Sequence, residues 1–346
     1  MKAQVIQADK TIKIEQKQVP TIGDDEVLVK VTAVAQNPTD WKHVEYMTVP
    51  NAICGCEFAG HIVKVGKSVT RVSVGDLVSG SNHGSAYPDK GSFAEYVNAL
   101  EDLVWKVPEG LSAEQAAGMN VGPLTVVQSF YSPKNLGLPI PPAKVEGDQW
   151  ILIYGGSSSV GMYAIQIAKI SGFKVATTSS PRNFELVKSL GADAVFDYRD
   201  TDVVSKIKAT TNDSIHIALD TISTADSQLL TVNAFAPGPG KLHLILVPSP
   251  PAQKVREDVK FTMSLLYSAF GVAFGFANGV SFPAAPEDRA FIRDWLAGPG
   301  IRLLNEGKIK PNPIKVLPGG LEGIPAGFEY MKAGKNSAEK LVFKLE

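Results

Sequence analysis

The feature that most constrains the fold is a glycine-rich turn between an apolar run and an apolar helix. WILIY (150–154) is typical of a buried strand, GGSSSVG (155–161) of a tight turn, and VGMYAIQIAKIS (160–171) of a buried helix. In this order the backbone of the turn can approach a phosphate group, and the helix N-terminus presents free N–H groups to it. The candidate contacts are Gly155, Gly156, Ser157, Ser158, Ser159, Val160 and Gly161, where a serine replaces the middle glycine of G-x-G-x-x-G. A turn that binds nothing is the alternative.

Strands and helices alternate regularly after this turn. Further apolar or β-branched runs occupy 173–178, 194–198, 215–220 and 241–247, with an amphipathic helix predicted at 184–191. This alternation predicts an α/β fold with a doubly wound parallel sheet, covered by helices on both faces.

The residues before this region have a different pattern. Short β-prone runs at 27–35, 59–66, 76–80 and 92–99 predict an all-β block, a partly open barrel without a long helix. Ser112 and Gln115 form a capping box that starts a helix, and a second helix is expected after Pro123.

The chain returns to β-type sequence at its end. A helix is expected from Pro286 to Gly307, then a β segment at 309–318, a short helix near 324–333 and a last strand at 339–346. We therefore expect one domain made of residues 1–123 plus 308–346, with an α/β domain of residues 124–307 inserted in it.

Two other stretches need interpretation. Residues 132–149 contain four prolines and are expected to form an exposed loop, which is either passive or functional.

No charged residue falls between Lys260 and Glu287, so this stretch is long and apolar enough to be considered as a membrane helix. Its glycines and serines and the two prolines that follow argue against a membrane helix. A buried segment lining a cleft or a subunit contact is the better interpretation.

Composition excludes some partners and favours a compartment. The 34 basic and 35 acidic residues leave no basic excess for binding nucleic acid. The only cysteines, Cys54 and Cys56, form no disulfide framework, and the first residues lack an apolar signal region. A reducing, cytoplasmic location without membrane contact is expected.

The residues at the end of the second strand of the α/β region indicate whether the nucleotide is NADH or NADPH. NAD enzymes usually place an acid there for the ribose 2′-hydroxyl. ATTSSPRN (176–183) has no acid, and Ser180 with Arg182 suits a 2′-phosphate, so NADPH is favoured. Arg182 as a solvated helix-start residue is the alternative. Tyr198 can stack near the adenine or simply pack.

Several motifs together resemble a known family. NPTDW (37–41), GCEFAGHIVKVG (55–66), GDLVSG (75–80), VPEGLSAEQAA (107–117) and the glycine-rich turn resemble the medium-chain dehydrogenase/reductase superfamily, in its zinc-free branch of quinone oxidoreductases and enoyl reductases. The proline-rich insertion, residues 179–199 and the ending AEKLVFKLE are most similar to fungal trans-acting enoyl reductases of polyketide biosynthesis. The resemblance implies a GroES-like catalytic domain around a Rossmann-like NADPH-binding domain.

The resemblance also implies an activity. Such enzymes use NADPH to reduce an activated carbon–carbon double bond in a small-molecule or carrier-bound enoyl substrate, in trans on a polyketide synthase. A reductase of quinones or small α,β-unsaturated ketones is the alternative, and a non-catalytic NADPH-binding protein is a further one. The branch contains monomers and homodimers.

Metal dependence is not expected. Zinc-dependent relatives carry a cysteine where this chain has Asn37, and a His-Glu pair where it has Cys56-Glu57. A catalytic zinc needs three protein ligands, and losing the thiolate and the imidazole leaves too few. The five histidines are also far apart in the sequence.

Site residues follow from the resemblance. Lys42 and Thr125 are the candidate donors to an enolate oxygen, with Asp40 orienting Lys42. Lys42 as a surface residue and Thr125 as a helix-start hydroxyl are the alternatives. Asn183, Ile222 and Lys340 are further cofactor contacts. Phe270, Gly271 and Phe274 are expected to line the acyl pocket, or else to pack in a core.

Overall fold

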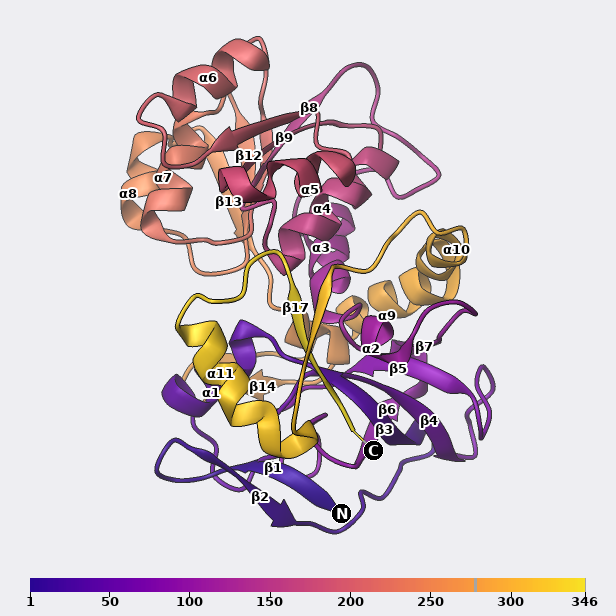
Figure 1. The fold of residues 1–346 in the computed structure, drawn as a ribbon. Helices are drawn as coiled ribbons and strands as arrows, with labels where there is room; N and C mark the ends of the chain where they lie inside the picture. The colour runs from indigo at the N-terminus through magenta and orange to yellow at the C-terminus, as the bar shows by residue number, and fades with distance from the viewer. Residues whose placement is uncertain (277–278, 346) are drawn as a thin grey trace. The chain divides into compact units, whose positions relative to one another are not determined.

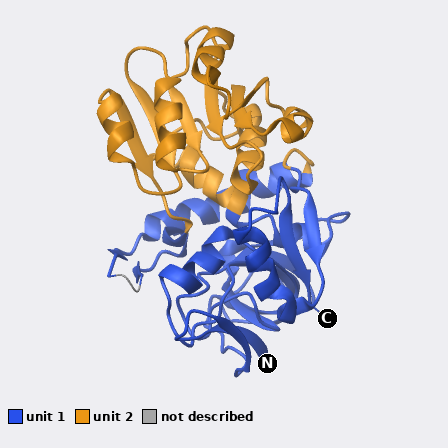
Figure 2. Ribbon diagram, turned by 60° about the vertical axis from the view of Figure 1, so that its left-hand side comes forward, with its two compact units in different colours: residues 1–121, 267–305, 310–346 blue, residues 122–266, 306–309 orange. Residues whose placement is uncertain are grey.

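The chain forms two compact units. A computed structural model describes residues 1–276 and 279–345. Unit 1 comprises Met1–Val121, Tyr267–Asn305 and Lys310–Glu346, and unit 2 comprises Gly122–Leu266 and Glu306–Ile309 (Figure 2). Each unit is described here by itself.

Within the described residues, unit 2 contains a parallel sheet of six strands in the order β10-β9-β8-β11-β12-β13 (Figure 1). This confirms the predicted doubly wound sheet. Leu152 pairs with Ala176 on one side and Ala218 on the other, so β8 is a central strand, and Leu152 is fully buried. The strands are β8 (Trp150–Tyr154), β9 (Lys174–Ser179), β10 (Ala194–Asp197), β11 (Ile217–Asp220), β12 (Gly240–Leu244) and β13 (Val259–Met263).

Two helices of this region begin at a residue whose side chain caps the helix. Ser158 caps the helix after the glycine-rich turn, and Thr224 caps α7 by accepting from the backbone N–H of Ser227. The helices are α3 (Val121–Tyr131), α4 (Ser159–Ile170), α5 (Phe184–Ser189), α6 (Val203–Thr210), α7 (Ala225–Asn233) and α8 (Pro250–Val255). The sequence did not predict β13, a strand at the end of the sheet order in which Lys260 and Thr262 interrupt the apolar run.

The proline-rich insertion is anchored rather than free. Residues 132–149 form neither a helix nor a strand, yet Leu136 and Leu138 are buried. Their backbone N–H groups donate to Ser129 (3.1 Å) and Phe130 (2.8 Å), and the Lys241 ammonium donates to the Leu136 carbonyl (3.2 Å). The expectation of an exposed loop therefore holds only in part, because the apolar side chains are covered.

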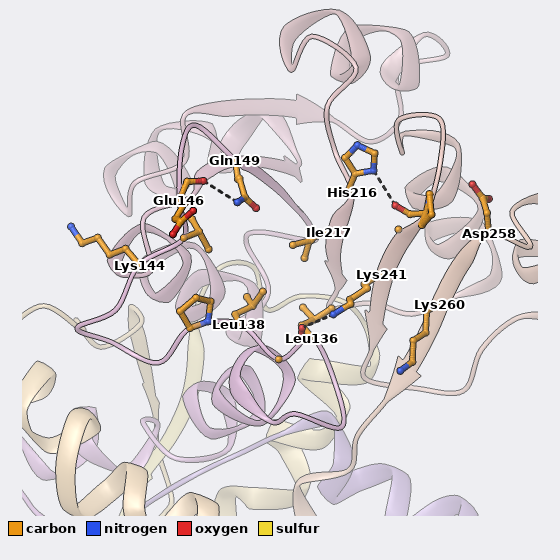
Figure 3. A pocket seen from close by; sticks show the side chains of 15 residues that line it. Leu136, Leu138, Lys144, Glu146, Gln149, His216, Ile217, Lys241, Asp258 and Lys260 are labelled. Carbon is orange, nitrogen blue, oxygen red and sulfur yellow. Dashed lines mark hydrogen bonds between the residues drawn. The ribbon is translucent and has the colours of Figure 1, made fainter.

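This loop borders a pocket of about 700 Å³ (Figure 3). His216, Lys241 and Lys260 line it at the amino-terminal ends of β11, β12 and β13. The glycine-rich turn follows the carboxyl end of β8, so the pocket and the turn lie at opposite edges of the parallel sheet.

Unit 1 is organised around a mixed sheet. Among residues 1–276 and 279–345 the sheet has seven strands, in the order β16-β17-β3-β4-β5-β7 with β6 paired to β3 (Figure 1). β17 pairs antiparallel with β3, with Val342 opposite Ala35, so the last strand and the early strands share one core. Two further pairs, β1 with β2 and β14 with β15, form separate two-stranded sheets. The strands of unit 1 are β1 (Lys2–Ile6), β2 (Ile12–Gln16), β3 (Glu26–Ala35), β4 (Glu57–Val65), β5 (Leu77–Ser81), β6 (Tyr96–Leu100), β7 (Val104–Lys106), β14 (Phe274–Gly275), β15 (Ser281–Phe282), β16 (Ile314–Leu317) and β17 (Lys340–Lys344).

The helices of unit 1 include one that the sequence prediction missed. The block predicted as strands and turns contains α1 (Pro38–Tyr46), which begins at Pro38 and is capped by Asp40. The capping box of Ser112 and Gln115 does start a helix, as expected. The remaining helices are α2 (Ala113–Ala117), α9 (Pro286–Trp295), α10 (Ile301–Asn305) and α11 (Ile324–Lys332).

The helix expected at 286–307 is interrupted. A π-helical turn at Leu296–Gly300 contains Pro299, which has no N–H to donate to a helical carbonyl. This segment belongs by its contacts to unit 1, whereas the sequence boundary at 308 places it with the α/β part. Arg289 explains the grouping, because its guanidinium contacts the carboxylates of Asp102 (2.9 Å) and Asp25 (3.0 Å). In the described part of the chain, no helix has the length and apolar character needed to cross a membrane.

Candidate active site

The glycine-rich turn has a backbone that only small residues permit. Gly155 has φ +80°, in the left-handed region. A Cβ on Gly161 would lie 2.2 Å from the Gly155 carbonyl oxygen, so a side chain there would displace the turn. Ser158 Oγ accepts from the Gly161 N–H (2.9 Å) and lies 2.8 Å from Thr221 Oγ1. The serine therefore caps α4 and fixes the shape of the turn, which leaves phosphate binding to the backbone and to the other turn residues.

The end of β9 carries a cation without a carboxylate partner. Ser180 is half-buried and Arg182 is exposed in a short 3-10 turn, Pro181–Asn183. No described residue forms an ion pair with Arg182. Arg199, which the sequence reasoning did not consider, is instead held by two hydrogen bonds to Asp197 (2.9 and 2.8 Å). The Arg182 guanidinium at the end of β9 is therefore available to bind the 2′-phosphate of a nucleotide.

The neighbouring candidates are accessible. Tyr198 is 42% exposed, with the Arg199 guanidinium 5.7 Å from its ring centroid. Ile222 is 40% exposed, and its N–H donates to Asp220 Oδ1 (2.9 Å). Asp220, which the sequence reasoning missed, organises this loop from the carboxyl end of β11. Asn183 ends the 3-10 turn. These residues follow the carboxyl ends of parallel strands, where dinucleotides bind in such sheets.

Unit 1 holds a buried ion pair beside Asn37, where the resemblance places a ligand cysteine in zinc-dependent relatives. Lys340 on β17 is 3% exposed and Glu57 on β4 is fully buried. The Lys340 ammonium lies 2.5 Å from Glu57 Oε1 and donates to Asn37 Oδ1 (2.5 Å). Asn37 Nδ2 donates to Glu57 Oε1 (2.9 Å), and the Val121 N–H donates to Glu57 Oε2 (2.8 Å). Both charges therefore have several partners.

This arrangement bears on the metal question. The Lys340 ammonium binds Glu57 Oε1 and Asn37 Oδ1, so these two oxygens are already engaged in the structure. Among the described residues, no group of three or more His, Cys, Asp or Glu side chains has a geometry that holds a metal ion. Lys340 is also a predicted cofactor contact, and in this structure its ammonium is engaged with Glu57 and Asn37.

The predicted catalytic residues occupy different settings. Asp40 is fully buried, and burial raises its pKa from 3.8 to about 7, although the Asn37 N–H bound to Oδ2 (2.7 Å) opposes the rise. Lys42 is half-buried, with Nζ 5.7 Å from the Trp41 ring centroid. No described hydrogen bond or ion pair joins Asp40 to Lys42, which is consistent with their i, i+2 spacing on α1. Thr125 is half-buried on α3 in unit 2.

The predicted acyl-pocket residues belong to an aromatic cluster in unit 1. Phe270 and Phe274 are 8% and 6% exposed, and Gly271 between them has φ +76°. Both rings flank His83, at centroid distances of 6.0 and 5.2 Å. A groove of about 630 Å³ runs along the cluster, lined by Ala86, Tyr87, Ala273, Phe274, Gly275, Ser281, Phe282 and Pro283.

Four residues that the sequence analysis did not select meet inside this cluster: Thr39, His43, His83 and Tyr267. His43 and His83 are 40 residues apart in the sequence, so their spacing gave no sign that they meet. The signal that could have identified Thr39 and His43 was their i, i+4 spacing after Asn37-Pro38, which is a helix start. No sequence signal links Tyr267 to them.

Comparisons with known proteins agree with these two units. The model of the alcohol dehydrogenase GroES-like domain matches residues 23–109, and that of the zinc-binding dehydrogenase matches residues 159–277. The trans-enoyl reductase ACTTS2 of Alternaria alternata is 39% identical, over all of this chain and 99% of the relative.

Two solved structures share the fold over the whole chain. The CurK enoyl reductase has a TM-score of 0.77 at 21% identity, covering 100% of this chain and 99% of the other. A mycobacterial protein complexed with NADPH has a TM-score of 0.76 at 22% identity, covering 100% of both. The fold and the two family models define a medium-chain dehydrogenase/reductase. Within that class, the chain belongs to the trans-enoyl reductase family, and it is an oxidoreductase of the enoyl reductase type.

We predict that the buried ion pair is indispensable to the stability of unit 1. Lys340→Met should lower the free energy of unfolding by about 3–5 kcal/mol, because it leaves the Glu57 carboxylate buried without a cation. Lys174→Met, which removes an exposed pair with Asp148, should cost no more than about 1 kcal/mol. Denaturant unfolding of both variants measures the difference.

A double variant provides the control for this prediction. Glu57→Gln together with Lys340→Met removes both charges, so much of the loss should be recovered. If Lys340→Met unfolds like the Lys174→Met protein, the pair is not the structural element inferred here.

Proposed function

We propose that this enoyl reductase uses NADPH, requires no metal, and acts on enoyl chains carried by a polyketide synthase. The observation that carries the proposal is the Lys340 ammonium paired with Glu57 at the position of the zinc ligands. The relative ACTTS2 is named a trans-enoyl reductase, which supports a carrier-bound substrate. The two free cysteines are buried, which fits a reducing, cytoplasmic compartment. In this proposal the protein acts as a monomer or a homodimer.

The residues of unit 2 fit a phosphorylated dinucleotide. The backbone of Gly155–Gly161 would hold the pyrophosphate, and Ser180 with Arg182 would hold the 2′-phosphate. Tyr198, Asn183 and Ile222 would border the adenosine, with Lys340 as a further contact from unit 1. When bound, the cofactor supplies a hydride.

The absence of a Lewis acid restricts the acceptor. Without a metal, nothing strongly polarises an isolated ketone, so the substrate must already be activated by conjugation of its double bond with a carbonyl. Addition of hydride at the β-carbon then places negative charge on the carbonyl oxygen. Lys42 and Thr125 are the donors that we assign to that oxygen. The apolar residues Phe270, Gly271 and Phe274 would hold the acyl chain.

Two other functions give different results in the same assay. A reductase of quinones or small unsaturated ketones would oxidise NADPH with those acceptors and not with enoyl thioesters. A non-catalytic binding protein would bind NADPH without turnover on any acceptor.

The cofactor assignment predicts a preference for NADPH over NADH of at least about tenfold, or about 1.4 kcal/mol. Arg182→Ala should weaken NADPH binding and leave NADH binding nearly unchanged, because only NADPH carries the phosphate that this guanidinium would meet. Titration of cofactor fluorescence measures both affinities. Lys188→Ala, which removes an exposed lysine paired with Glu185 on α5, is the matched control. Equal losses for the two cofactors in Arg182→Ala would contradict the assignment.

The donor assignment predicts effects on turnover rather than on cofactor binding. Enolate charge develops only during hydride transfer, so Thr125→Val should lower kcat by one to three powers of ten, about 1.4–4 kcal/mol. Lys42→Ala should act likewise, with an added rise in KM if it also contacts a phosphate. Steady-state kinetics with a crotonyl thioester and its ketone analogue test this, and wild-type kcat in both variants on every acceptor would refute it.

A further inference from the structure

Reduction of an enoyl group needs a proton as well as a hydride, and the residues discussed so far supply none at the α-carbon. We infer that Tyr267 is the acid that protonates the α-carbon, with Thr39 and His43 as the relay that directs its hydroxyl. The inference rests on the proposed enoyl reduction.

The three residues form a continuous hydrogen-bonded chain within unit 1. Tyr267 Oη lies 2.6 Å from Thr39 Oγ1, and Thr39 Oγ1 lies 3.1 Å from His43 Nδ1. Tyr267 and His43 are 8% and 2% exposed, so bulk water does not compete for these bonds. Thr39 and His43 are one helical turn apart on α1, which fixes both relative to Tyr267.

The backbone sets the direction of the chain. His43 Nδ1 also lies 2.8 Å from the Thr39 carbonyl oxygen, which can only accept, so Nδ1 carries the hydrogen. With Nδ1 as a donor, Thr39 Oγ1 accepts from it and its own hydrogen points to Tyr267 Oη. The Tyr267 hydrogen is then directed away from Thr39. Cys56 Sγ lies 3.7 Å from Tyr267 Oη and can accept this hydrogen, and sulfur is a weak acceptor.

The position of Cys56 indicates which part of a substrate the Tyr267 hydroxyl would meet. Zinc-dependent relatives have a ligand histidine where this chain has Cys56, and their metal polarises the reacting carbonyl. The Tyr267 hydroxyl therefore lies beside the position at which zinc-dependent members of the superfamily polarise the substrate carbonyl. The α-carbon is bonded directly to that carbonyl carbon.

The surroundings keep the hydroxyl protonated and in place. Burial raises the pKa of Tyr267 well above its ordinary value, so the phenol keeps its proton until a stronger base is formed. The His83 ring stacks on Tyr267 with centroids 4.0 Å apart, and burial lowers the pKa of His83 to about 3. A neutral imidazole thus supports the ring and adds no charge. His83 is a positioning residue in this arrangement.

The step is balanced. Hydride adds to the β-carbon, and the electron pair of the double bond moves into the enolate. The Tyr267 O–H bond then breaks as the α-carbon–hydrogen bond forms, which leaves a phenolate. The Thr39 hydroxyl passes a proton to the phenolate and takes the Nδ1 proton of His43. Nε2 of His43 takes a proton from water that enters as the product leaves, so the ring stays neutral and only changes tautomer.

Tyr267→Phe tests the assignment, because it removes the hydroxyl and keeps the ring that stacks on His83. With a 2-methyl-enoyl thioester and NADPH, kcat should fall about 10²-fold, while KM and NADPH affinity stay within about threefold. In D₂O the wild type should deliver deuterium to one face of the α-carbon, giving one epimer. The variant should give a mixture of epimers, because water then protonates the released enolate.

The relay and a control complete the experiment. Thr39→Val should lower kcat and mix the epimers, and Thr39→Ser, which keeps the hydroxyl, should restore both; this pair decides the question if Tyr267→Phe does not fold. Tyr330→Phe removes a hydroxyl bonded to Lys315 and Glu339 and should leave kcat and the single epimer unchanged. A folded Tyr267→Phe protein with wild-type kcat and a single epimer overturns the inference. A wild type that reduces no enoyl thioester refutes the proposed function itself.

Discussion

The ion pair between Lys340 and Glu57 is the interaction on which both the fold and the chemistry of unit 1 depend. Two charges removed from water are tolerated only when their remaining hydrogen-bonding capacity is filled. Asn37 bridges the pair, and backbone N–H groups of Asn120 and Val121 reach the second carboxylate oxygen. The pair also joins β17 near the end of the chain to β4, which precedes it by almost the whole chain.

The same pair supports the proposal of a reductase that works without a metal. In that proposal, activation of the substrate is left to hydroxyl and ammonium donors. Such donors act on a carbonyl that is already conjugated, and they can also deliver a proton. The cluster of Tyr267, Thr39 and His43 beside Cys56 has this chemical character.

Local patterns made much of the fold predictable. The strand, turn and helix at 150–171, the capping box at Ser112 and the β-prone runs all report on neighbouring residues, so the sequence reveals them directly. The helix α1 was missed because its signal, Pro38 followed by Asp40, is short and lies among strands. The continuous helix expected at 286–307 was too long because apolar periodicity continues through Pro299.

The candidate site was predictable only where it is local. The turn residues and Arg182 follow strand ends that the sequence reveals. Tyr267 is 228 residues from Thr39, and Lys340 is 303 residues from Asn37. No periodicity connects such positions, because they meet only after the sheets have formed. The sequence analysis therefore selected Lys340 as a cofactor contact but could not show that it pairs with Glu57, which only the structure shows.

The metal content of active enzyme tests the central claim most directly. Protein purified without added metal would be assayed for NADPH-dependent reduction of an enoyl thioester before and after treatment with a chelator, with zinc determined on the same samples. We predict full turnover with far less than one zinc per chain and no loss after chelation. Stoichiometric zinc whose removal abolishes turnover would contradict it.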